Sequence, residues 1–155
     1  MNQSSASGVA AAGQANSAGY AGDVDVVAAW EELRRNPDAR MVDVRTKAEW
    51  TFVGIPDLSE AGKEVDLVEW QSFPTMDQNG GFVGEVSARI ADKSAPVFLL
   101  CRSGARSKSA AMALTAAGYE TCFNVSGGFE GPHDGEKHRG TTDGWKAKGL
   151  PWVQG

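Results

Sequence analysis

The sequence predicts an α/β fold in which a parallel β-sheet is flanked by helices. Short apolar runs typical of strands alternate along the chain with segments typical of helices. The run from Val97 to Leu100 is apolar at every position, as expected of a central parallel strand that is covered on both faces. Such strands are joined by right-handed crossovers, and ligands bind at their carboxyl ends.

Capping residues and apolar spacing define the predicted elements. Asp25 can cap a helix from Val26 to Arg35, with Val27, Trp30 and Leu33 at helical spacing and Asn36-Pro37 at its end. The other predicted elements are a strand at 39–44, a short helix after the capping box that begins at Thr46, a loop at 54–58, a strand at 64–69, a turn at 79–81, helices at 82–91 and 107–117, strands at 97–100 and 121–125, an extended loop at 130–143, and a short helix at 145–148.

Composition bounds the organisation and the partners. The 155 residues suit one domain, which we place at 20–153 after a disordered leader at 1–19 without the features of a signal peptide. A net charge of -5 argues against nucleic acid or an anionic membrane surface as the main partner. No apolar run approaches the roughly 20 residues of a membrane span, so we expect a cytoplasmic protein.

The two cysteines do not form a disulfide framework, and neither has the spacing of a zinc site. His133 and His138 lie apart from both cysteines, so we expect no metal. Cys122 lies in a predicted strand beside Phe123, where a buried thiol is expected; a resolving thiol that attacks a persulfide is the alternative.

Cys101 lies directly after the strand 97–100 and is followed by the loop Arg102-Ser103-Gly104-Ala105-Arg106-Ser107 and then by a helix. Gly104 permits a tight curve that turns loop amides inward, and the helix adds its positive end. Ser103 and Ser107 can donate hydrogen bonds to the sulfur, and the Arg106 fork can clamp an oxyanion. We therefore expect a nucleophilic thiolate that carries a charged covalent adduct.

The length of the loop separates two chemistries. A cysteine phosphatase places its arginine six positions after the cysteine, whereas Arg106 follows Cys101 by five. The smaller ring fits one added sulfur atom better than a tetrahedral phosphoryl group. A phosphatase or an arsenate reductase on the same scaffold is the less favoured alternative.

Several separated motifs resemble the single-domain form of the rhodanese (thiosulfate sulfurtransferase) family. The matching segments, in chain order, are Val42-Asp43-Val44-Arg45, Glu49-Trp50, Val97 to Ser107, Ala110-Ala111 with Leu114, Ala117-Gly118-Tyr119, Asn124-Val125, Gly127-Gly128, Trp145, and Gly149-Leu150-Pro151. The resemblance implies a three-layer α/β/α fold around a mostly parallel five-stranded sheet. The segments 54–80 and 130–144 depart from the family pattern, and Trp70 and Phe73 in the first are candidates for the pocket rim.

The resemblance also implies a two-step transfer through a persulfide on Cys101, without a metal or an organic cofactor. A small anionic donor such as thiosulfate gives its outer sulfur to Cys101, and a thiol or cyanide then removes it. Arg102 and Arg106 would flank the persulfide, while Asp43 and Arg45 would support the loop from the neighbouring strand. A sulfur-carrier module that acts with a sulfur-relay protein is the main alternative function.

Overall fold

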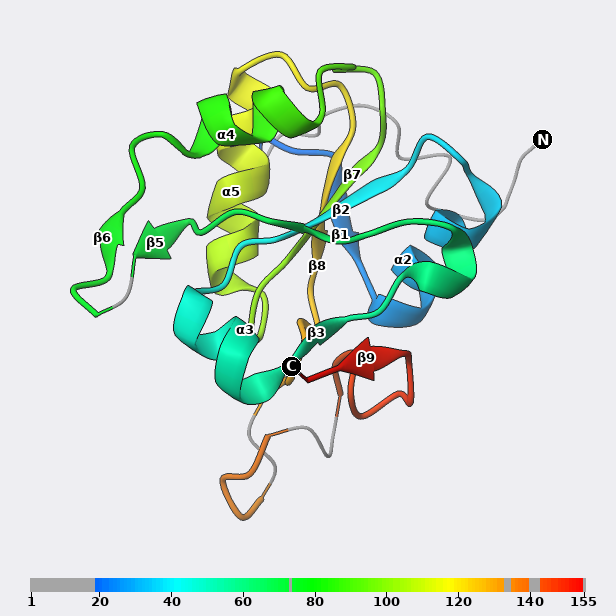
Figure 1. Ribbon diagram of the computed structural model, residues 1–155, viewed down its shortest axis with the longest axis vertical. Coiled ribbons are helices and arrows are strands. Elements are labelled where there is room, and N and C mark those ends of the chain that lie inside the picture. The colour runs from blue at the N-terminus through cyan, green and yellow to red at the C-terminus, as the bar shows by residue number, and fades with distance from the viewer. Residues whose placement is uncertain (1–18, 73, 133–134, 140–142, 155) are drawn as a thin grey trace.

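The computed structural model describes residues 19–72, 74–132, 135–139 and 143–154, and every structural statement refers to these. Five strands form one sheet in the order β1-β8-β7-β2-β4, and every neighbouring pair is parallel (Figure 1). In that order they span Gly22–Val24, Cys122–Val125, Val97–Leu100, Arg40–Asp43 and Asp66–Leu67. The predicted α/β class and the predicted five-stranded parallel sheet are confirmed.

Helices cover both faces of this sheet (Figure 1). The side chains of β7 alternate between two apolar clusters. Val97 and Leu99 pack with residues of α4 (Phe82–Arg89) and α5 (Ala105–Ala116). Phe98 and Leu100 pack with residues of α2 (Val26–Arg35) on the other face. Both clusters are buried, so β7 is covered on each side, as its uninterrupted apolar sequence predicts.

The first helix, α2, has the predicted ends. The Asp25 carboxylate accepts a hydrogen bond from the Ala28 amide, and Asn36 caps the other end. The predicted apolar stripe is partly wrong, because Val27 is 42% exposed. The buried stripe instead follows the spacing i, i+3, i+4, i+7 and consists of Val26, Ala29, Trp30 and Leu33.

Two pairs of short strands were not predicted. The predicted loop at 54–58 contains β3 (Ile55–Pro56), which pairs with β9 (Trp152–Val153) near the C-terminus. β5 (Gln71–Ser72) pairs with β6 (Asp77–Gln78) in a small hairpin. Strands of two residues carry no periodicity, so the sequence pattern gives no signal for them.

The remaining boundaries differ only in part from the prediction. The edge strand β1 was missed, the strand expected at 64–69 shortens to β4, and the helix expected at 145–148 is a series of turns. The short helix α3 spans Lys47–Val53 behind the predicted capping box, and a 3-10 turn, η1, spans Ser59–Ala61. Of the leader predicted at 1–19, residues 1–18 lie outside the described residues. None of the described helices is long and apolar enough to cross a membrane.

Candidate active site

Cys101 follows β7 directly, at the carboxyl edge of the sheet, as predicted. The neighbouring strand β2 ends at the same edge, because Asp43 pairs with Leu100 and the Val44 amide donates to the Leu100 carbonyl over 2.8 Å. The cysteine is only 1% exposed. The site therefore lies where a parallel sheet presents its ligand-binding edge, with the sulfur recessed below the surface.

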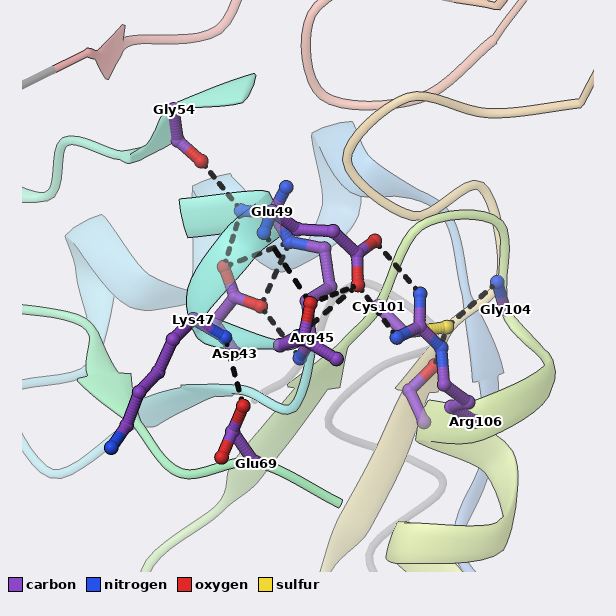
Figure 2. A network of polar contacts seen from close by, with 11 residues as sticks. Asp43, Arg45, Lys47, Glu49, Gly54, Glu69, Cys101, Gly104 and Arg106 are labelled. Carbon is purple, nitrogen blue, oxygen red and sulfur yellow. Dashed lines mark hydrogen bonds and ion pairs between the residues drawn. The ribbon is translucent and has the colours of Figure 1, made fainter. Parts of the chain in front are cut away.

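Two groups contact the sulfur of Cys101. The Gly104 amide donates to Sγ over 3.1 Å, and the hydroxyl of Ser107 lies 3.2 Å from it (Figure 2). Helix α5 begins at Ala105, two residues earlier than predicted, so Arg106 and Ser107 belong to its first turn. The sulfur consequently lies at a helix N-terminus, where unpaired amides and the helix dipole favour negative charge.

Gly104 has to be a glycine for two reasons. Its φ of +116° lies in the left-handed region, and an added Cβ would lie 2.6 Å from the carbonyl oxygen of Ser126. A side chain here would therefore displace the amide that contacts the sulfur.

The turn after β8 is hydrogen-bonded to the start of the Cys101 loop. The Phe129 amide donates to the Cys101 carbonyl over 2.8 Å, and the amides of Glu130 and Gly131 both donate to the Arg102 carbonyl over 3.0 Å. At Gly128, with φ of +69°, an added Cβ would lie 2.4 Å from the Arg102 carbonyl oxygen. This close contact explains why position 128 of the Gly127-Gly128 motif is a glycine.

Ser107 is connected to a chain of polar side chains that was not predicted. Its Oγ lies 2.6 Å from Oδ1 of Asn124, and the Asn124 amide nitrogen donates to Asp23 over 2.9 Å. The Tyr20 hydroxyl donates to the same Asp23 oxygen over 2.8 Å. A hydroxyl has one proton, so Ser107 can donate either to Asn124 or to the sulfur at one time. The buried Ser107 and Asn124 thus make the hydrogen bonding of Cys101 adjustable.

Arg106 forms a bidentate ion pair with Glu49 of α3. Its Nη1 and Nη2 donate to Oε1 and Oε2 over 2.7 and 2.9 Å, and Figure 2 shows the pair beside Cys101. The Glu49 hydrogen bond, the charge of Glu49 and the charge of the Cys101 thiolate raise the pKa of Arg106 against the opposing effect of burial. The binding of a donor oxyanion by Arg106 stays a prediction. In the structure the two terminal nitrogens of Arg106 bind Glu49.

Glu49 itself is held in its charged form. Burial tends to raise the pKa of this carboxyl, but the hydrogen bonds from Arg106 and Thr46 outweigh it and lower the pKa to about 2. Thr46 contributes through the capping box of α3. The motif Glu49-Trp50 was quoted only as a resemblance, so the pairing of Glu49 with Arg106 is a feature that sequence reasoning missed.

Asp43 and Arg45 form a fully buried ion pair at the end of β2. The Nε and Nη2 atoms of Arg45 bind the Asp43 carboxylate over 2.7 to 3.2 Å, and Nη2 also donates to the Gly54 carbonyl. The guanidinium lies 4.2 Å from the centre of the Phe129 ring. Arg45 thus packs on the ring of the residue whose amide binds the Cys101 carbonyl, and the predicted support of the loop by this pair stays a prediction. Among the described contacts, neither side chain has a hydrogen bond to the sulfur.

The other predicted loop residues surround the sulfur without a hydrogen bond to it among the described contacts. Arg102 and Ala105 are exposed, and Ser103 is half-buried. Trp70 packs edge-on against Phe82, 5.1 Å between ring centres, and Phe73 lies outside the described residues. His133 also lies outside the described residues. The described part of the chain contains no cluster of metal-ligating side chains.

Cys122 lies at the opposite end of the parallel strands from Cys101. It pairs with Val97 at the start of β7, whereas Cys101 follows the end of that strand. Four residues of a strand span about 13 Å, too far for a disulfide. Burial raises the pKa of the Cys122 thiol to about 12. The expectation of a buried strand residue is confirmed, and the alternative of a resolving thiol is wrong.

Comparisons with known proteins give the family. The sequence-family model described as the STR4 middle domain matches residues 22–155. The crystal structure of Rv0390 from M. tuberculosis is 51% identical, with a TM-score of 0.82 over 88% of this chain and 99% of that one. An uncharacterized protein of Rickettsia conorii is 41% identical over 80% of this chain and 90% of its own length.

Relatives with named activities are more distant. The thiosulfate sulfurtransferase GlpE of Actinobacillus pleuropneumoniae is 27% identical over 79% of this chain and 84% of its own. The chloroplastic rice protein named thylakoid rhodanese-like is 30% identical over 85% of this chain and 25% of its own. With a strand-end cysteine under a helix N-terminus and a model match over residues 22–155, the chain belongs to the rhodanese-like family.

Proposed function

We propose that this protein is a sulfurtransferase that carries a sulfane sulfur as a persulfide on Cys101. The observation that carries the proposal is the setting of Sγ, with the Gly104 amide and the Ser107 hydroxyl within 3.2 Å at the N-terminus of α5. Preorganised donors of this kind stabilise the negative charge that the sulfur carries before and after transfer. The family relationship supports the same activity.

The reaction is a displacement in two steps. The Cys101 thiolate attacks the outer sulfur of thiosulfate, a sulfur–sulfur bond forms, and the sulfur–sulfur bond of the donor breaks so that sulfite leaves with the electron pair. In the second step an acceptor such as cyanide attacks the outer sulfur of the persulfide. Thiocyanate leaves, and the Cys101 thiolate returns.

The contacts of Arg106 favour sulfur transfer over phosphoryl transfer. A phosphoryl group has three charged oxygens that need donors around them. Glu49 already takes two of the five N–H donors of Arg106 and compensates its charge, so this guanidinium supports such a group less than an unpaired one would. A single added sulfur atom needs no such clamp.

The direct test is thiocyanate formation from thiosulfate and cyanide. We expect turnover by the wild type and by Cys122→Ala, the matched control that removes the distant thiol, and none by Cys101→Ala. Activity retained in Cys101→Ala would show that the nucleophile is wrong. Hydrolysis of an aryl phosphate at a comparable rate would favour the phosphatase.

Intact mass separates the enzyme from a carrier that acts with a protein partner. After treatment with thiosulfate, we expect the mass of one added sulfur on the wild type and its loss when cyanide is added. A stable added sulfur that small acceptors do not remove would favour the carrier.

A further inference from the structure

Glu49 occupies the position at which a guanidinium beside the reactive sulfur could receive an anion. Both terminal nitrogens of Arg106 bind its carboxylate, at 2.7 and 2.9 Å. The two side chains are 16% and 20% exposed, so water screens the pair only in part. Figure 2 shows the guanidinium of Arg106 with Glu49 on one side and Cys101 near the other. A donor that reaches Cys101 therefore meets a cation whose charge is already compensated by the carboxylate on its other side.

The position of Glu49 does not depend on Arg106 alone. The amide and the hydroxyl of Thr46 each donate to Oε1 over 3.1 Å, and the Glu49 amide donates back to Thr46. This capping box belongs to α3, so the carboxylate is anchored to the helix backbone. With a pKa lowered to about 2, Glu49 is ionised at neutral pH.

The charges around the sulfur can be compared directly. Asp43 cancels the charge of Arg45 in a pair with no exposed surface, and Glu49 cancels that of Arg106. Arg102 is exposed, and it forms no ion pair within the part of the chain that the structure describes. Among these side chains Arg102 is therefore the one cation left uncompensated in the described part of the chain, and it lies at the surface, where water screens its charge.

We propose that Glu49 makes this site select sulfane-sulfur donors with a single negative charge, such as the persulfide of a small thiol, over dianionic donors such as thiosulfate. The proposal rests on the sulfur-transfer function proposed above. Arg106 is the cation next to Cys101, and Glu49 compensates its charge, so a second negative charge on the donor gains little attraction from the pair. Glu49 thus acts as an element of specificity by neutralising the cation that would otherwise favour a dianion.

Two donors that differ by one charge test this directly. Thiosulfate is a dianion, and the methanethiosulfonate anion carries one charge, because a methyl group replaces one oxygen. In both, Cys101 attacks the outer sulfur, the same kind of sulfur–sulfur bond breaks, and the electron pair leaves with sulfite or with methanesulfinate. The ratio of the two kcat/KM values is measured with cyanide as acceptor. A change of this ratio between wild type and a variant reports donor charge, because the difference between the leaving groups is the same in both proteins.

The variant Glu49→Gln removes the charge and keeps the side chain that a capping box accepts. Glu69→Gln is the matched control. The Glu69 carboxylate accepts a hydrogen bond from the Lys47 amide at the same end of α3 but lies away from Arg106 (Figure 2). Glu69→Gln therefore removes one negative charge without changing the ion pair between Arg106 and Glu49. We expect Glu49→Gln to raise the ratio of thiosulfate to methanethiosulfonate kcat/KM about tenfold, the effect of roughly one close pair of unit charges. Glu69→Gln should leave the ratio within about twofold of wild type, as expected for screened charges.

The possible outcomes separate the failure of this selectivity proposal from the failure of the proposed sulfur-transfer function. If Glu49 only positions Arg106, the variant lowers kcat/KM for both donors by the same factor, and the proposal is overturned. An equal shift in Glu69→Gln also overturns it, because the effect would then be one of net charge. If neither donor yields thiocyanate or added mass with the wild type, the sulfur-transfer function itself fails. Should Glu49→Gln not fold, Glu49→Ala takes its place, and a donor ratio unchanged from wild type overturns the proposal.

Discussion

At the scale of single residues, the site depends on what each side chain near the sulfur is bound to. Ser107 and Arg106 both lie in the first turn of α5, but their partners give them different roles. Ser107 shares its proton between Asn124 and the sulfur, whereas Arg106 is engaged by Glu49. The first residue can respond to the charge on Cys101, and the second is neutralised before a donor arrives.

Replacing Ser107 tests the first of these roles. We expect Ser107→Ala to slow persulfide formation roughly tenfold, because a hydrogen bond to a charged group contributes about 1.5 to 3 kcal/mol. Sulfite release from thiosulfate in a single turnover is the measurement. Ser109→Ala, an exposed change on the same helix, is the control and should match the wild type. Equal rates for the two variants would remove Ser107 from the site.

At the scale of elements, the loop after β7 takes its shape from the turn after β8. Three amides of that turn, from Phe129, Glu130 and Gly131, bind the first two carbonyls of the loop. The two segments are separated in sequence by the whole of α5 and β8. The geometry at the sulfur is therefore a property of two adjacent parallel strands and the turns that follow them.

Two glycine substitutions should have opposite effects. At Gly128 a methyl group would lie 2.4 Å from the Arg102 carbonyl oxygen at a φ of +69°, so Gly128→Ala should destabilise the fold and abolish sulfur transfer. Gly84 lies inside α4 with no heavy atom within 4 Å of an added Cβ, so Gly84→Ala should stabilise by up to about 1 kcal/mol. Urea denaturation measures both changes. Similar midpoints for the two variants would contradict the proposed contact.

At the scale of the whole molecule, the ion pair of Glu49 with Arg106 makes stability depend on pH. The folded pKa of Glu49, about 2, lies below its ordinary value near 4.5. The unfolded chain therefore binds more protons between these two values, and the free energy of unfolding rises with pH across that window. Asp57 and Asp92, whose pKa values are lowered by hydrogen bonds from Ser59 and Ser94, add to the same slope.

The contribution of Glu49 can be isolated with Glu49→Gln. We expect the stability gap between wild type and variant to be largest above about pH 5 and to shrink as the pH falls toward 2. Urea midpoints measured at intervals over this range provide the comparison, and the gap at pH 6 serves as the internal reference. A gap that is constant with pH would mean that Glu49 does not contribute through its charge.

The sequence by itself determined the α/β class, the central strand Val97–Leu100, the ends of α2, the capping box at Thr46 and the place of Cys101 between a strand and a helix. These features depend on neighbours in sequence, namely apolar periodicity, caps and turn residues. The buried stripe of α2 was only partly predicted, because the orientation of a helix is set by the sheet on which it packs.

Only the tertiary structure decided which partners the charged and polar side chains have. Glu49 meets Arg106 and Ser107 meets Asn124 across separations of 57 and 17 residues. Strand order and register decide two further features. They bring the turn at Gly128 against the Cys101 loop, and they place Cys122 at the other end of the strands from Cys101. Local sequence patterns do not encode such contacts, because they arise when distant segments are brought together by burial of the two apolar clusters.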